Sequence, residues 1–323
     1  MHINETRGDN QAVAIDDPLG PGFDLAYLSD LPSGNGNVGF VSRLSASIHD
    51  KSFSDDIIKH NSLHETFRQW GDRILVMSSK FKVASSELGG EAMAEDLSGN
   101  VERFMGFADC YDAYRPTPPQ VIIDILTQLA GVNEPKLVVD LGCGTGLSSR
   151  IWAGRAAEVI GIEPSADMRA QAEDRAAALE TETKFVFRAG LSTETGLPDG
   201  CVDIVTCSQA LHWMEPEGTF AEASRILRKG GVFAAIDCDW PPVVNVEVDC
   251  AYQEASRRVS ALSRERGVSE SVKRWAKDKH LERIRESGRF RYTREILAHG
   301  IEKGDADRLV GLMLSQGSVQ SLL

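Results

Sequence analysis

The stretch VVDLGCGTGLSSR, residues 138–150, places three glycines within five positions directly after a run that favours a β-strand. Glycine destabilises regular structure, so such a cluster marks a place where the backbone turns sharply or approaches a ligand. The stretch therefore predicts a buried strand, a tight turn able to cradle a ligand, and a helix that follows the last glycine.

The composition of the chain limits the class of protein and the partners that can be expected. The chain has 323 residues, 42% of them hydrophobic, and a net charge of −13. A packed core is therefore expected, and a nucleic-acid partner is not, because such proteins present a basic surface. No apolar stretch reaches membrane-span length and the N-terminus has no signal-like apolar run. We therefore expect no membrane contact. The six cysteines show no C-x-x-C spacing, which indicates reduced thiols in a cytoplasmic protein.

Short apolar runs alternate with helical patterns from about residue 101 onward. This alternation predicts a parallel α/β sheet of the Rossmann-like, doubly wound class in a domain that covers residues 101–323. Strands are expected at 136–142, 158–164, 184–190, 202–210 and 232–239, and helices at 118–131, 147–156, 165–180 and 218–231. A helical cap over the substrate is expected at 245–287, a further strand at 288–300 and a final helix at 305–323.

Residues 1–100 differ from the rest and predict a poorly structured N-terminal extension, partly disordered. Within it, residues 55–81 carry apolar side chains at roughly helical spacing and predict a helix or two. His60 and His64 could form a zinc pair, but two solvated histidines are the preferred interpretation, because no third ligand is evident nearby. No metal site is expected.

The ligand of the glycine turn is predicted from its spacing and from two acids. Gly142, Gly144 and Gly146 give G-x-G-x-G, whereas the dinucleotide fingerprint is G-x-G-x-x-G with a pyrophosphate on the helix N-terminus. Asp140 before the turn would repel a pyrophosphate and suits the ammonium group of S-adenosylmethionine. Glu163, at the end of the second strand, suits the ribose hydroxyls of either ligand.

Five stretches carry a resemblance to a known family: RFMGFADCYDAYRP (103–116), VVDLGCGTG (138–146), VIGIEPSADM (159–168), AGLSTETGLPDGCVDIVTCSQALHWM (189–214) and ILRKGGVFAAID (226–237). In this order they resemble class I S-adenosylmethionine-dependent methyltransferases. The likeness runs from about 103 to 301 and is best over 138–237. Within that class the chain is most similar to the small-molecule branch that includes the trans-aconitate and ubiquinone/menaquinone methyltransferases.

The resemblance implies a set of cofactor contacts and a lid, with each role open to a structural alternative. The cofactor residues it implies are Asp140, Gly142, Cys143, Gly144, Glu163, Met168, Leu191, Ser192, Ser208 and Gln209, and the substrate or lid residues are Tyr111 and Arg115. Asp140 could instead cap a helix, and Glu163 could be an exposed loop acid. Met168 and Tyr111 could be ordinary packing residues, and Arg115 a surface charge.

The chemistry follows from the cofactor, whose sulfonium methyl is already activated. The protein must align an acceptor and exclude water, so a base is optional. His212 is the candidate catalytic base; the alternative is that His212 and Trp213 only shape the loop and pack against the cofactor. The basic helices within 245–287 favour an anionic small-molecule acceptor, although solvated helix faces with paired charges would show the same residues.

One departure and two competing functions accompany this interpretation. Members of the family usually end in a hairpin whose last strand inserts antiparallel into the sheet, and no such strand is visible after residue 300. Residues 75–84 are the one strand-like substitute in the extension. A non-catalytic S-adenosylmethionine-binding or interaction protein is therefore the main alternative, and an NAD-dependent oxidoreductase the third. The sequence predicts no oligomeric state.

Overall fold

The structure is a computed structural model that describes residues 67–79, 98–268 and 273–323. All of these residues belong to one compact unit. His60 and His64, which are interpreted from the sequence as two solvated histidines rather than a zinc pair, lie outside the described residues, as does most of the N-terminal extension.

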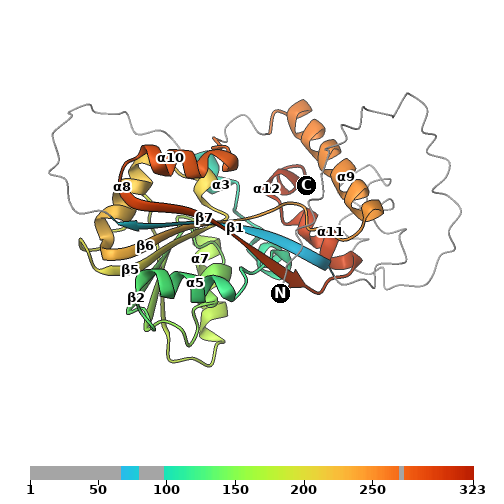
Figure 1. Ribbon diagram of the computed structural model, residues 1–323. Helices are drawn as coiled ribbons and strands as arrows, with labels where there is room; N and C mark the ends of the chain where they lie inside the picture. The colour runs from blue at the N-terminus through green and yellow to red at the C-terminus, as the bar shows by residue number, and fades with distance from the viewer. Residues whose placement is uncertain (1–66, 80–97, 269–272) are drawn as a thin grey trace, which may run out of the picture. The chain divides into compact units, whose positions relative to one another are not determined.

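A seven-stranded sheet in the order β4-β3-β2-β5-β6-β1-β7 forms the centre of this unit (Figure 1). Five neighbouring strands are parallel: β2 (Leu137–Leu141), β3 (Glu158–Ile162), β4 (Lys184–Arg188), β5 (Val202–Ser208) and β6 (Leu227–Cys238). Their central members are buried almost throughout because both sheet faces are covered, which is why they read as continuous apolar runs. The predicted Rossmann-like, doubly wound class I methyltransferase fold is confirmed.

Helices cover both faces of the sheet and bury two separate apolar clusters. On one face α5 (Val121–Ala130) packs against β2, β3 and β6. On the other, α8 (Pro216–Ile226) and α10 (His280–Glu286) pack around Phe233 and Phe290. Near the strand ends lie α6 (Leu147–Arg150) and α7 (Ala166–Ala177). The remaining short elements are α3 (Ser98–Glu102), α4 (Ala108–Tyr114), η2 (Leu211–Trp213) and η3 (Lys277–Lys279).

The N-terminal segment contributes a strand to the interior of the sheet. The helix predicted over 55–81 is wrong for β1 (Phe67–Ser79), which lies antiparallel between β6 and β7 (Phe290–Glu302). Val76, for example, is paired with Ala234 of β6 and with Arg294 of β7. The position that the family resemblance assigns to a last antiparallel strand is therefore filled by residues 67–79. The strand-like substitute expected at 75–84 overlaps only its end, and residues 80–84 are not described.

Three predicted helices have different bounds in the structure. The helix expected at 218–231 ends at Ile226, because Leu227 pairs with Val202 and begins β6. The helix expected at 147–156 stops after one turn at Arg150. The helix expected at 305–323 divides into α11 (Ala306–Leu314) and α12 (Gly317–Gln320).

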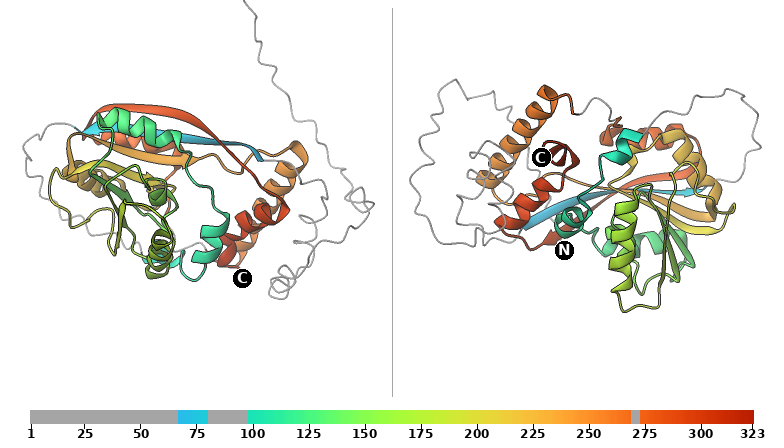
Figure 2. Two further views of the ribbon diagram at one scale, coloured as in Figure 1. Left: turned by 90° about the horizontal axis from the view of Figure 1, so that it is seen from below. Right: turned by 180° about the vertical axis from the view of Figure 1, so that it is seen from behind.

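A helical subdomain lies beside the sheet rather than over its faces, as two views show (Figures 1 and 2). It consists of α9 (Val246–Glu265), α11 and α12, which share a buried cluster around Val248, Tyr252 and Met313. Of the cap expected at 245–287, α9 lies in this subdomain, whereas α10 packs on the sheet through Ile284. Within the described ranges, no helix is long and apolar enough to cross a membrane.

Candidate functional site

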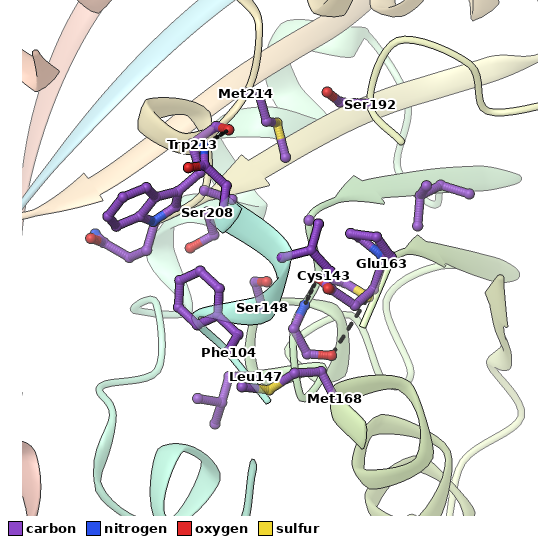
Figure 3. Close-up of a pocket in the computed structure, with 18 of the residues that line it drawn as sticks. Phe104, Cys143, Leu147, Ser148, Glu163, Met168, Ser192, Ser208, Trp213 and Met214 are labelled. Carbon is purple, nitrogen blue, oxygen red and sulfur yellow. Dashed lines mark hydrogen bonds between the residues drawn. The ribbon is translucent and has the colours of Figure 1, made fainter. Parts of the chain in front are cut away.

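A cavity lies at the carboxyl ends of the parallel strands, where open α/β sheets bind their ligands (Figure 3). Three strand ends form its floor: Gly142–Gly144 after β2, Glu163 after β3, and Ser208 with Gln209 at the end of β5. Figure 3 shows Phe104 and Trp213 on one side, with Glu163 and Cys143 on the other. The predicted residues that line this cavity are Tyr111, Arg115, Gly142, Cys143, Gly144, Glu163, Met168, Leu191, Ser192, Ser208 and Gln209.

The glycine turn combines left-handed backbone with close packing. Gly142 has φ +64°, and a Cβ there would lie 2.5 Å from the Cε of Met214. Gly144 has φ +55°, and a Cβ there would meet no atom within 4 Å. Because Gly144 lines the cavity, a side chain at this position would occupy space that a ligand needs. The turn therefore leaves open space against its backbone at the cavity wall, which is the feature predicted for a cradle that binds a ligand.

Gly144→Ala tests this cradle, with Gly154→Ala as its matched control. Gly154 also has positive φ (+68°) and open space around it, but it does not line the cavity. Both variants should lose about 1 kcal/mol of stability from backbone strain. Only Gly144→Ala should also weaken binding of S-adenosylhomocysteine, by about tenfold, in calorimetric titration. Equal affinities in the two variants would contradict the cradle.

Glu163 is a buried acid with acceptor capacity at the cavity wall. Its Oε1 accepts a hydrogen bond from the Ser165 amide (2.9 Å) and its Oε2 accepts one from the Gly144 amide (3.1 Å). Burial raises the pKa of the Glu163 carboxyl, and these two amides oppose that rise. A carboxylate has about four lone-pair sites, so two remain for hydroxyl donors of a ligand.

The apolar walls beside Glu163 come from α7 and from the loop after β4. Met168 is buried, whereas Leu191 lines the cavity with 52% of its surface exposed. An apolar side chain left open at a cavity mouth offers a surface for a flat ring. The Ser192 hydroxyl is hydrogen-bonded to Thr219 Oγ1 at 2.7 Å, so it is already engaged within the protein.

Asp140 is the predicted cofactor residue that the structure does not place on the cavity wall. Its side chain is fully buried, and one oxygen accepts hydrogen bonds from Ser148 (2.7 Å) and Ser149 (2.6 Å). The other oxygen accepts one from Thr206 Oγ1 (3.0 Å). Burial raises the pKa of Asp140, and the three hydroxyls oppose that rise. These hydrogen bonds tie Asp140 of β2 to α6 and β5, and the ligand contact that the family resemblance implies for Asp140 stays a prediction.

His212, the candidate base, also lies behind the wall. It belongs to η2, its side chain is 6% exposed, and its ring does not line the cavity. Burial, followed by the nearby Lys277 and Arg274 cations, holds the pKa of His212 far below its usual range. Of the two roles considered for this histidine, the structure favours packing, since its ring contacts Trp213 (centroids 4.6 Å apart).

Several cavity residues were not predicted from the sequence, among them Phe104, Met214 and Cys238. Trp213, which was considered only for packing, also lines the cavity and meets Phe104 edge to face with ring centroids 5.8 Å apart. Trp213 follows His212 directly, and Phe104 lies in the entry segment, so the aromatic residues of 103–116 and 211–214 were the available signal. These two segments meet only in the folded protein, so no local sequence pattern could predict their contact.

Comparisons with known proteins agree with this geometry over the central part of the chain. Residues 139–235 match the family model described as "Methyltransferase domain". A "Probable S-adenosylmethionine-dependent methyltransferase" of Saccharomyces cerevisiae is 32% identical over 126 residues, which cover 38% of this chain and 43% of the relative. An uncharacterized methyltransferase of Mycobacterium bovis is 35% identical over 121 residues, or 38% of this chain and 46% of the relative. The chain thus spans less than half the length of these curated relatives.

Solved structures are also similar over parts of their length. A geranyl diphosphate methyltransferase in complex with its substrate and sinefungin is 26% identical, with a TM-score of 0.33, and covers 36% of this chain and 44% of that chain. The geranyl diphosphate C-methyltransferase of Streptomyces coelicolor is 19% identical, with a TM-score of 0.37, over 52% of this chain and 57% of that chain.

The sheet has the Rossmann-like fold of class I methyltransferases, and the chain is similar in sequence to S-adenosylmethionine-dependent methyltransferases over its central part. Residues 139–235, which run from β2 to β6, are the part matched to the methyltransferase domain family.

Proposed function

We propose that the chain transfers a methyl group from S-adenosylmethionine to a small anionic acceptor. One observation carries the proposal: a single cavity has a buried carboxylate, Glu163, beside the glycine turn and a guanidinium, Arg115, among its other lining residues. The first suits a nucleoside with free hydroxyls. The second suits an acceptor with a carboxylate or phosphate.

The residues present fit the cofactor. The two lone-pair sites left on Glu163 would accept the ribose hydroxyls, and Leu191 with Met168 would flank the adenine. The open space beside Gly144 admits a ligand against the backbone. When bound, S-adenosylmethionine supplies an electrophilic methyl on a positively charged sulfur. Ser208 and Gln209, at the end of β5, would line the reacting end.

The protein's own part in the reaction is positioning and the exclusion of water. Phe104, Tyr111 and Trp213 form an aromatic wall, in which Phe104 contacts the other two rings. His212 lies behind this wall, so it is not placed to take a proton from an acceptor in the cavity. An acceptor that is already an anion needs no such base. This is a further reason to propose an anionic acceptor.

Three arginines give this part of the molecule its positive charge. Arg115 stacks on Tyr111 (4.9 Å from guanidinium carbon to ring centroid) and Trp240 (4.8 Å), and donates from Nε to Ser315 Oγ (2.9 Å). Arg103 and Arg274 lie 5.1 and 5.4 Å from the Trp213 ring centroid.

Burial, followed by the nearby Arg274 and Arg115, lowers the pKa of Arg103, so the three cations are close enough to repel one another. Among the described residues, none of the three forms an ion pair with a carboxylate. Clustered cations without a carboxylate partner are stabilised by an anionic ligand. An acidic chain that concentrates positive charge beside a cavity is therefore suited to a small anionic acceptor.

A radiolabelled methyl-transfer assay tests the proposal, with a panel of small carboxylic and phosphoric acids and the neutral ester of each. We expect transfer to one or more acids, little transfer to the matching esters, and a loss of about tenfold or more in kcat/KM in Arg115→Gln. Transfer to the neutral esters alone would contradict the anionic acceptor. S-adenosylhomocysteine binding without transfer to any member would favour the non-catalytic alternative.

A further inference from the structure

Gln209, which follows β5 and lines the cavity, has an unusual backbone conformation. Its φ is +52°, and it is the one non-glycine residue with positive φ in the described part of the chain. Its amide donates to the Ile236 carbonyl at 2.8 Å, which fixes the residue against β6. Strained backbone of this kind persists only where the surroundings hold it, and it is concentrated at functional sites.

Lys277 forms a hydrogen bond with the side chain of Gln209. Its Nζ donates to Gln209 Oε1 at 2.6 Å and forms an ion pair with Asp237 Oδ1 at 2.9 Å. An ammonium group has donors and no acceptor, so the amide must turn its oxygen to Lys277. The two N–H donors of Gln209 are left for another partner.

Asp237 anchors Lys277 in a buried setting. The side chain of Asp237 is 13% exposed and that of Lys277 is 29% exposed. His212 Nδ1 and His280 Nε2 face the same carboxylate at 3.9 and 3.8 Å, which is too far for hydrogen bonds. Burial is the main cause that lowers the pKa of both rings, that of His280 to about 4, so near neutral pH both are uncharged. Lys277 is therefore the cation that Asp237 pairs with among these groups.

We infer that Lys277 is a positioning residue that fixes the Gln209 carboxamide with its N–H groups toward the acceptor. The inference rests on the proposed methyl transfer at this cavity and goes beyond it. It assigns a function to a residue outside the strands and outside the cavity lining. It also names a chemical requirement: the group that meets Gln209 must present an oxygen that accepts hydrogen bonds, such as a carboxylate or enolate oxygen, rather than an N–H donor.

The first experiment measures the side-chain amide of Gln209 by nuclear magnetic resonance and needs no methyl acceptor. In ¹⁵N-labelled protein saturated with S-adenosylhomocysteine, the side-chain amide signals of Gln209 are assigned by their loss in Gln209→Leu. We expect Lys277→Met to move these signals toward free glutamine and to speed their exchange with solvent by at least tenfold. Lys277→Arg should retain most of the wild-type position. Lys279→Met is the matched control, because Lys279 is exposed and paired with Glu282.

The second experiment separates positioning from cofactor binding. Lys277→Met should bind S-adenosylhomocysteine within about threefold of wild type and lose tenfold or more in kcat/KM for an acid acceptor. Unchanged amide signals in Lys277→Met would overturn the inference, even if methyl transfer is found. If no acceptor is found but the signals move as expected, the positioning by Lys277 stands and the proposed function fails.

Discussion

Replacing Val76 by proline is expected to lower the melting temperature by about 6–12 °C or to abolish cooperative unfolding. Val76 lies in the middle of β1, paired with Ala234 on one side and Arg294 on the other. Proline cannot donate to a strand ladder and is excluded from central strands. The acceptor that it leaves unpaired costs about 1–3 kcal/mol, so with the disturbed backbone we expect a total of about 3 kcal/mol. For a domain of this size, 1 kcal/mol corresponds to about 2–4 °C.

Val76→Ile is the control, because isoleucine keeps the backbone N–H and the β-branched side chain. Thermal unfolding followed by circular dichroism measures both variants. A melting temperature in Val76→Pro equal to that of the control would contradict the placement of residues 67–79 between β6 and β7. The expected result would show that this N-terminal segment is a structural part of the domain that contains the parallel strands.

Replacing Glu163 by glutamine should weaken the binding of S-adenosylhomocysteine by about 10- to 100-fold, the range expected when a charged acceptor of hydrogen bonds is lost. The free energy of unfolding of Glu163→Gln should not fall along with its affinity. Burial raises the folded-state pKa of Glu163, so its contribution to stability is full below the unfolded pKa and is lost as pH rises through the folded pKa. Relative to wild type, Glu163→Gln should therefore gain stability as pH rises toward neutral.

Glu158→Gln is the matched control for this prediction. Glu158 lies at the other end of β3 and pairs with the exposed Lys184, away from the cavity. Calorimetric titration at neutral pH should give it wild-type affinity. Equal affinities for the two variants would show that Glu163 does not contact the ligand.

The five parallel strands were predictable because each contains a short apolar run, although β6 begins five residues earlier than its run indicates. Val138, Val159 and Val205 are fully buried, and continuous apolar sequence is the expected signature of strands covered on both faces. β1 was not predictable in the same way. Its apolar residues have roughly helical spacing, and its partners β6 and β7 lie far along the chain, so tertiary pairing overrides the local pattern.

The candidate site likewise has residues that could be predicted from the sequence and residues that could not. Backbone positions at strand ends, such as Gly144, Glu163 and Ser208, reach the cavity because the topology places every parallel strand end at one edge. The side chains of Asp140 and His212 are not among the cavity's lining residues: Asp140 accepts a hydrogen bond from Thr206, and the His212 ring packs against Trp213. The pairing of Asp140 with Thr206 joins two strands, and no spacing in the sequence reveals it.

The most direct test of the central claim is calorimetric titration of the full chain with S-adenosylhomocysteine, with NADH titrated in parallel. We predict one site of micromolar affinity for S-adenosylhomocysteine, weakened in Gly144→Ala and Glu163→Gln, and no heat of binding with NADH. Saturable binding of NADH to a folded protein, with none of S-adenosylhomocysteine, would contradict the account.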